Sequence, residues 1–148
     1  MSSTAPDFWL APLLAEAGLG TAEQFASLPV AAGGRLWEAI VQAGIATDGA
    51  ITSAVAARYR AEVANLSEAD SRSATIIPES VARKHHVVPV TLDGRTITVA
   101  TTDPRDISVE QELEFVTGRM IRFQIASPGD IAEKLDDFYR PENKINRL

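Results

Sequence analysis

Residues 87–106 constrain the fold of this chain more than any other segment. Two runs rich in β-branched residues flank Asp93-Gly94, a dipeptide that accepts the positive φ angles of a two-residue hairpin turn. Ile97 and Val99 alternate with polar residues along the second run, which predicts a sheet with one covered face. Asp103-Pro104 ends the strand, because proline cannot donate a hydrogen bond to a strand ladder. A β-hairpin covered by helices is therefore expected.

Residues 77–140 are predicted to form a small α/β subdomain in the order helix, β-hairpin, helix, strand, helix. In the helix after the hairpin, Ser108 and Gln111 offer a capping box, and Asp106 competes for the cap. Gly118 suits the left-handed position that follows a last helical residue. Alternating apolar residues then predict the strand, and the final helix has an apolar stripe at helical spacing.

The N-terminal part, residues 1–66, carries a weak internal repeat. The stretches that start at Trp9 and Arg35 superpose, so that Gly18 and Gly44 take the same place. Each copy is typical of a helix, a glycine stop, a cap and a second helix, and the second copy ends in a longer helix that runs to the end of this part. Four helices arranged as two helix hairpins are therefore predicted.

The polar segment 67–76 is predicted to link the two parts, and residues 141–148 lack an apolar period and are expected to form a tail. The expected fold class is α+β, a four-helix subdomain followed by the α/β subdomain. At 148 residues, the chain suits one domain or two small subdomains.

The charge balance limits the function classes. Lys and Arg number 14 against 20 Asp and Glu, a net charge of −6, which argues against nucleic-acid binding. The absence of cysteine excludes disulfides and thiolate chemistry, and fits a cytoplasmic setting. The first residues do not follow the pattern of a signal peptide, and no apolar stretch has the length of a membrane span, so direct membrane insertion is not expected.

No motif in the sequence indicates catalysis. The phosphate-binding loop Gly-x-x-x-x-Gly-Lys-Ser/Thr is absent, and no nucleophile, base and acid form a recognisable set. His85 and His86 invite a metal hypothesis, but neighbouring residues that enter a strand point to opposite faces. We therefore expect no catalytic residue, no metal site and no required cofactor.

The order of motifs over residues 77–140 carries a family resemblance. It runs from PESVARKHHVVPV through DGRTITVATTDPRD to a helix that ends in Thr-Gly and a last helix that ends in an aromatic pair. This order resembles the N-terminal domain of type II secretion and type IV pilus assembly ATPases, the GspE N-terminal or MshE N-terminal family. The motor that hydrolyses ATP in these bacterial proteins is a separate C-terminal domain.

The resemblance implies a non-catalytic regulatory or docking module that mediates protein–protein interaction. Its implied partner is the cytoplasmic part of an inner-membrane assembly-platform protein, which would recruit the module to the inner face of that membrane. Similar domains are also fused to membrane glycosyltransferases, so a covalently attached effector domain is a second implied partner.

The resemblance also implies an alternative function, the sensing of cyclic di-GMP. Family members that bind this dinucleotide carry two copies of an element that begins Arg-Leu-Gly, continues through paired aliphatic residues and a glycine, and ends in glutamine. In such an element arginine pairs with phosphate, and aliphatic rows pack against purines. The same leucine rows and glycines also fit the plain hypothesis of a helical core with helix stops.

The match to that element is partial, so the repeat is degenerate. In the second copy Trp37 stands where glycine is expected and Arg58 where glutamine is expected, and in the first copy Trp9-Leu10-Ala11 replaces Arg-Leu-Gly. The candidate ligand-binding residues carried over from the family are Trp9, Leu10, Leu14, Gly18, Arg35, Leu36, Ile40, Gly44 and Arg58.

Overall fold

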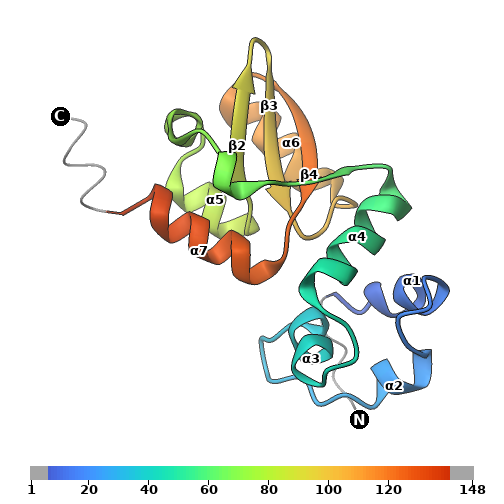
Figure 1. Cartoon of the computed structure of the whole chain (residues 1–148). Coiled ribbons are helices and arrows are strands. Elements are labelled where there is room, and N and C mark those ends of the chain that lie inside the picture. Colours follow the sequence, from blue (N-terminus) through green and yellow to red (C-terminus); the bar gives the residue numbers. More distant parts are fainter. Residues whose placement is uncertain (1–6, 141–148) are drawn as a thin grey trace. The chain divides into compact units, whose positions relative to one another are not determined.

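The computed structural model describes residues 7–140 and divides into two compact units (Figure 1). We call residues 1–60 the helical unit and residues 61–148 the α/β unit. The described part of the helical unit contains the four predicted helices. They are α1 (Leu10–Glu16), α2 (Ala22–Ala26), α3 (Leu36–Gln42) and α4 (Asp48–Tyr59).

The internal repeat of the sequence is also a repeat of local structure. Gly18 and Gly44 end α1 and α3 with φ angles of 79° and 74°. The residue after each glycine donates its N–H to the carbonyl oxygen five positions earlier, at 3.0 and 3.2 Å, as in a Schellman motif. Thr21 and Thr47 then cap the next helix, each accepting a backbone N–H at 3.1 Å. Both helix hairpins therefore turn in the same way.

Helix α4 is shorter than predicted. It ends at Tyr59, because Arg60 adopts the left-handed conformation with φ 54° and ψ 38°. The expected continuation toward residue 66 is wrong, since Glu62–Val63 forms strand β1. Val63 keeps the helical spacing of Ile51, Val55 and Tyr59 in the sequence, but in the structure it lies on β1 with its side chain 52% exposed. The apolar spacing thus predicted a helix where the chain forms a short strand.

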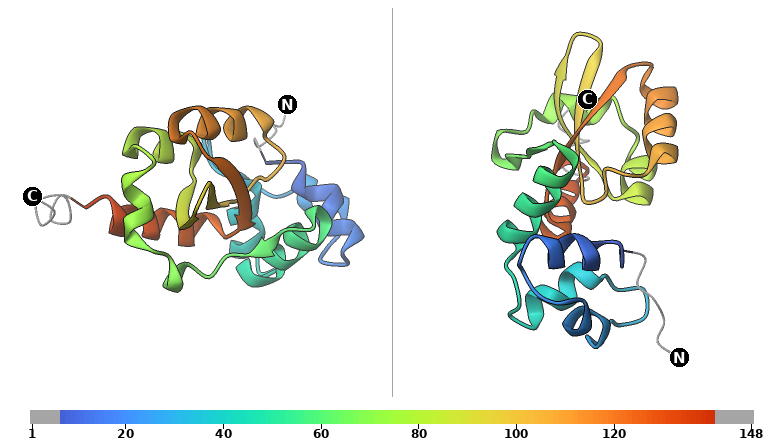
Figure 2. Two further views of the ribbon diagram at one scale, coloured as in Figure 1. Left: turned by 90° about the horizontal axis from the view of Figure 1, so that it is seen from above. Right: turned by 90° about the vertical axis from the view of Figure 1, so that its right-hand side faces the viewer.

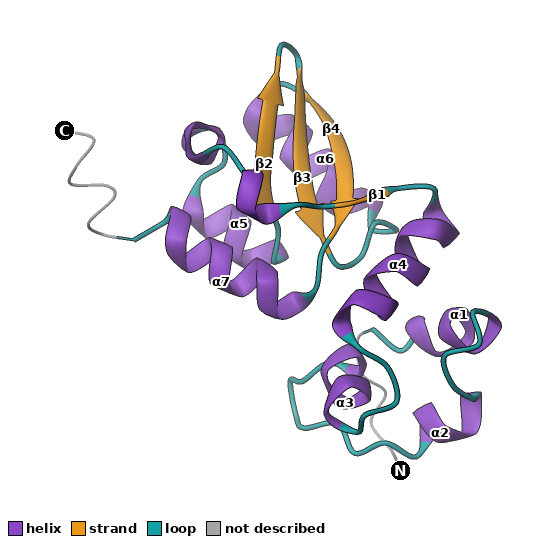
Figure 3. Cartoon of the chain, in the orientation of Figure 1, coloured by secondary structure: helices purple, strands orange, loops and turns teal. Residues whose placement is uncertain are grey.

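The α/β unit is built on a four-stranded mixed sheet with the strand order β1-β4-β3-β2 (Figure 3). Strands β2 and β3 are antiparallel, whereas β3 with β4 and β1 with β4 are parallel. The remaining strands are β2 (Val88–Asp93), β3 (Thr96–Thr101) and β4 (Met120–Ile125), and the α-helices are α5 (Glu79–His85), α6 (Ile107–Thr117) and α7 (Pro128–Phe138). The predicted order of helix, hairpin, helix, strand and helix is confirmed.

The apolar face of the sheet forms the core of this unit. Ile97 and Val99 are fully buried, as their alternation with polar residues predicts. The parallel register places Ile121 and Phe123 of β4 beside them. Helices α5, α6 and α7 add buried residues to the same cluster, and Figure 2 shows α6 along one face of the sheet.

The hairpin turn lies one residue later than predicted. Asp93 pairs with Thr96, so Gly94 and Arg95 are the two central residues. Of these two only Gly94 has a positive φ, 59°, which is the pattern of a type II′ turn with glycine first. The Asp-Gly dipeptide therefore marked the hairpin correctly and its centre one position too early.

Asp106 wins the competition for the cap of α6. Its Oδ1 atom accepts the N–H groups of Ser108 and Val109 at 3.1 and 3.3 Å. The same oxygen accepts the Ser108 hydroxyl at 2.6 Å, so Ser108 serves the cap and is not itself the cap. This bond is the main cause that lowers the pKa of Asp106. At the other end Gly118 is left-handed with φ 66°, as predicted.

The segment 67–76 is folded against the α/β unit, although it was predicted to be a linker. It contains the 3-10 helices η1 (Leu66–Glu68), in part, and η2 (Ser71–Thr75). Ser73 and Ala74 are buried, and the N–H of Asp70 donates to the carbonyl of Val90 on β2 at 2.7 Å. Short polar residues here form turns and caps. The division between the units falls earlier, between Arg60 and Ala61, and the expected tail at 141–148 lies outside the described residues.

Candidate ligand-binding surface of the helical unit

Trp9 and Arg58 meet at Tyr59, the last residue of α4. The Trp9 and Tyr59 rings lie edge to face, with centroids 6.3 Å apart and an interplanar angle of 78°. The Arg58 guanidinium carbon lies 5.3 Å from the centroid of the same Tyr59 ring, a cation–π distance. Trp9 is half-buried and Arg58 is exposed. Two of the candidates are therefore joined by an aromatic residue that the motif comparison had not singled out.

Arg35 occupies the N-cap position of α3, where Asp7 binds the exposed backbone N–H groups. The two carboxylate oxygens of Asp7 accept the N–H groups of Leu36 and Trp37 at 2.7 and 3.0 Å. The main-chain oxygen of Asp7 also accepts the N–H of Leu10 at 3.0 Å. One residue thus ties together the starts of α1 and α3. Its negative charge complements the partial positive charge at the start of α3.

The four aliphatic candidates lie in the interior of the helical unit. Leu10, Leu14 and Ile40 are 0% exposed, and Leu36 is 1% exposed. A purine packs only against a surface that solvent reaches, so these side chains are closed to a ligand in this conformation. Their role in the structure is to stabilise the packed helices, at about 1.5–3 kcal/mol for each fully buried side chain.

The two glycine candidates are needed for their backbone angles. A Cβ atom added to Gly18 or Gly44 would meet nothing within 4 Å. Space for a close backbone approach is therefore not what selects glycine here. The positive φ angles of the two helix stops are the cause, since residues with a Cβ adopt them at a cost.

Trp37 fills the interior at the position where the family element has glycine. Its side chain is 1% exposed, and its indole N–H donates to Oδ1 of Asp48 at 2.9 Å. The hydrogen bond satisfies the one polar atom of a large buried ring. Trp37, which replaces the glycine of the family element, is therefore a core residue. The comparison with that element does not indicate this role.

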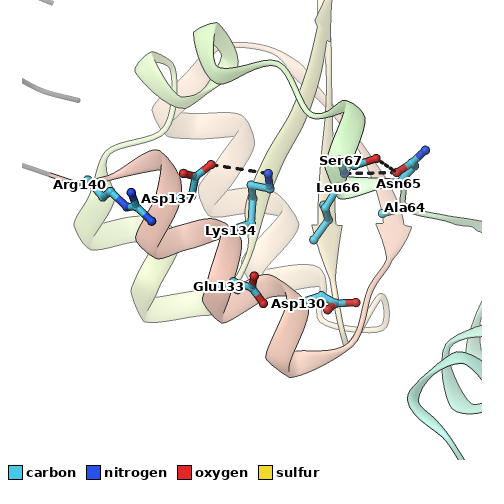
Figure 4. A pocket seen from close by; sticks show the side chains of 9 residues that line it. All are labelled: Ala64, Asn65, Leu66, Ser67, Asp130, Glu133, Lys134, Asp137 and Arg140. Carbon is cyan, nitrogen blue, oxygen red and sulfur yellow. Dashed lines mark hydrogen bonds and ion pairs between the residues drawn. The ribbon is translucent and has the colours of Figure 1, made fainter. Parts of the chain in front are cut away.

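The α/β unit has a hollow of its own, with a volume of about 510 Å³. Figure 4 shows that the hollow is lined by residues 64–67, which follow β1, and by one face of α7. Lys134 Nζ lies 3.7 Å from Asp137 Oδ2 and 5.4 Å from the centre of the Phe138 ring. Charges of both signs line the hollow, so its charge selects neither an anion nor a cation. The lining residues are Ala64, Asn65, Leu66, Ser67, Asp130, Glu133, Lys134, Asp137 and Arg140.

His85 and His86 connect three helices. Nε2 of His85 lies 2.7 Å from Oε1 of Glu112 on α6, and Nε2 of His86 lies 3.0 Å from the carbonyl oxygen of Pro128 on α7. The bond with His85 is the main cause that lowers the pKa of Glu112. In the part of the chain that the structure describes, no three His, Asp or Glu side chains are grouped to hold a metal ion.

The family model described as the MshEN domain matches residues 59–144, which span the described α/β unit. This chain belongs to the MshEN domain family. The type IV pilus assembly ATPase PilB of Myxococcus xanthus (strain DK1622) is 33% identical to this MshEN chain over 109 residues. That alignment covers 72% of the chain and 19% of PilB, so the chain spans about a fifth of the length of this relative.

Two solved structures share the fold of this MshEN chain. The structure of MshE with cdg, cyclic di-GMP, has a TM-score of 0.69 at 24% identity and covers 88% of this chain and 98% of that chain. The N-terminal domain of XpsE has a TM-score of 0.68 at 12% identity and covers 94% of this chain and 99% of that chain. Both confirm the predicted α+β fold, and the match of the MshEN family model together with PilB confirms the resemblance to the N-terminal domain of pilus assembly ATPases. Within residues 7–140, no helix is both long enough and apolar enough to cross a membrane.

Proposed function

We propose that this chain is a non-catalytic docking module that binds the cytoplasmic part of an inner-membrane assembly-platform protein. The interaction would hold a covalently attached effector at the inner face of the inner membrane. In a relative such as PilB, the remaining four fifths of the protein supply that effector. A membrane glycosyltransferase is the alternative effector.

One contrast carries the proposal. The α/β unit that the family model spans has a continuous buried core, whereas the aliphatic candidates for nucleotide contact are internal to the helical unit. A module that keeps its scaffold while its nucleotide element is degenerate is better suited to a protein partner than to a small ligand.

The docking function is tested by calorimetry with the recombinant cytoplasmic segments of assembly-platform proteins from the same genome. We expect saturable one-to-one binding by one of them. If none of these segments binds the folded chain, the docking function is wrong.

Cyclic di-GMP is the second candidate ligand, because the MshE structure that shares this fold was obtained with that dinucleotide. The exposed Arg58, the half-buried Trp9 and Arg35 are the surface candidates for contact with a phosphate or a base. Such binding would make the helical unit a sensor that controls the same docking event.

Titration with cyclic di-GMP decides this alternative. Saturable binding that Arg35→Ala or Arg58→Ala weakens about tenfold would support it, since an arginine–phosphate pair carries that order of free energy. Arg122→Ala, on β4 of the other unit, is the matched control and is expected to leave the affinity unchanged. Absence of saturable binding at high micromolar ligand removes the alternative.

A further inference from the structure

Helix α6 presents large apolar side chains to solvent on the side opposite its buried stripe. Val109 and Leu113 point into the core with 9% and 0% exposure, whereas Ile107 and Phe115 are 66% and 88% exposed. The two exposed residues are two helical turns apart, about 12 Å along the axis. Met120, which follows on β4, is also 66% exposed, but it points to the other face of the sheet, because its neighbour Ile121 packs on the core that α6 covers.

This concentration is unusual for the molecule. Of the six large apolar residues that are exposed in the described part of the chain, four fall between positions 107 and 120. They are Ile107, Phe115, Val116 and Met120. Scattered exposed apolar residues need no explanation, but three on one helix, Ile107, Phe115 and Val116, indicate an interaction surface.

The apolar surface carries uncompensated negative charge. Glu110 and Glu114 lie one turn apart on the same helix, and within residues 7–140 neither side chain has an ion-pair partner. Glu112, between them, is different, because Lys84 and His85 lie 3.6 and 2.7 Å from its Oε1 atom. The helix itself has no basic residue. A partner would therefore meet apolar anchors beside two free carboxylates.

These charges decide which occupant fits. A second copy of the chain would bring like charges face to face, and an anionic membrane surface would be repelled in the same way. A protein segment with apolar residues on one side and Lys or Arg at the rim would complement both the apolar and the acidic features.

We propose that the α6 surface, formed by Ile107, Glu110, Glu114 and Phe115, is the docking site for a positively charged amphipathic segment of a partner protein. This inference rests on the proposed docking function and names the surface and the chemistry of the partner. Phe115 is the central anchor, because a large aromatic side chain contributes most when a partner buries it.

The first experiment measures the affinity of the assembly-platform segment for wild type and for single variants of the full chain. Phe115→Ser and Glu114→Lys are expected to weaken binding about tenfold or more, the usual effect of losing a binding hot spot. The matched controls Val63→Ser, an exposed apolar residue on β1, and Glu133→Lys, an exposed acid on α7, are expected to stay within about twofold of wild type. Unchanged thermal unfolding would show that each variant is folded.

The second experiment uses a probe that does not depend on the natural partner. The isotope-labelled chain is titrated with a helical peptide of Leu and Lys, and separately with one in which Glu replaces every Lys, and the amide NMR signals are followed. The Leu-Lys peptide is expected to shift signals of residues 107–117 in wild type and not in Phe115→Ser. The Leu-Glu peptide is expected to leave them in place.

The outcomes separate this inference from the proposed function. If the platform segment binds wild type and Phe115→Ser equally, docking stands and the α6 surface is wrong. If no platform segment binds, the docking function fails, and the peptide titration alone decides the surface. A Leu-Lys peptide that shifts other residues or none, a Phe115-dependent dimer in sedimentation, or Phe115-dependent binding to phosphatidylglycerol vesicles would each overturn the assignment.

Discussion

The carboxylate of Asp7 caps helix α3 through the backbone N–H of Leu36, at 2.7 Å and across 29 positions of sequence. Such a cap normally comes from the residue directly before the helix, which here is Arg35. The long-range bond makes the start of α3 depend on the segment before α1.

Asp7→Ala should destabilise the helical unit by about 1–2 kcal/mol, because the first N–H groups of α3 lose their acceptor. Both tryptophans of the chain, Trp9 and Trp37, belong to this unit, so their fluorescence during urea unfolding reports on it. Glu16→Ala, an exposed acid at the end of α1, is the control and should not lower the midpoint. Equal midpoints for Asp7→Ala and wild type would contradict this account of the cap.

Gly44→Ala and Gly49→Ala should change stability in opposite directions. Gly44 has a φ of 74°, so an alanine there is strained by about 1 kcal/mol. Gly49 lies in α4, where an added Cβ meets nothing within 4 Å, and alanine there should stabilise by about 0.5–1 kcal/mol. The same fluorescence measurement checks both, and a shift of equal sign would show that the glycine stop is not what Gly44 provides.

Trp37→Gly restores the residue of the family element and should unfold the helical unit without creating a binding site. Removal of a fully buried indole leaves a cavity and costs about 3–5 kcal/mol, and it also leaves Asp48 without its 2.9 Å donor. The loss of helical circular dichroism measures the first effect, and a titration with cyclic di-GMP measures the second. A folded variant that gains saturable binding would show that Trp37 blocks a ligand site.

His85→Ala should raise the pKa of Glu112, because the hydrogen bond with His85 is the main cause that lowers it. A carboxyl with a lowered pKa stabilises the fold above the ordinary glutamate pKa of about 4.3, and this stabilisation is lost as the pH falls through its lower pKa in the folded state. An NMR titration of the Glu112 carboxyl carbon gives the value directly. His86→Asn is the control, because His86 contacts Pro128 and not Glu112, and asparagine tolerates the left-handed backbone of that position. This variant should leave the titration curve of Glu112 unchanged.

The sequence was a good guide to elements whose ends carry a local signal. Gly18, Gly44 and Gly118 are left-handed helix stops, and Thr21 and Thr47 are caps, because each depends on residues within one helical turn. The hairpin and the buried alternation of β3 follow from short-range patterns in the same way.

Features that depend on residues far apart in the sequence have no local signal that could predict them. Strand β1 has only two residues, and its partner β4 lies about sixty positions later, so no local period marks it. Asp7 as the cap of α3, and burial of Ser73 in a polar segment, also depend on contacts made only in the folded chain.

The candidate ligand-binding residues also show that a local pattern does not predict burial. A repeat motif indicates which residues correspond to a family's ligand contacts, but burial decides whether a ligand reaches them. Leu10, Leu36 and Ile40 match in position and are closed to solvent, whereas Tyr59, at the centre of the surface cluster with Trp9, is no part of the motif.

Strand β1 also covers part of one edge of the sheet. Without β1, the sheet would end in the free edge of β4, and exposed strand edges favour pairing between molecules. Glu62 and Val63 pair with the last two residues of that edge. The charged side chains of Glu62 and Arg122, which lie 3.6 Å apart, also disfavour edge-to-edge association. An expression fragment trimmed to begin at Ile77, as the motif boundaries suggest, would lose this cover together with the buried Ala74, and we expect it to aggregate.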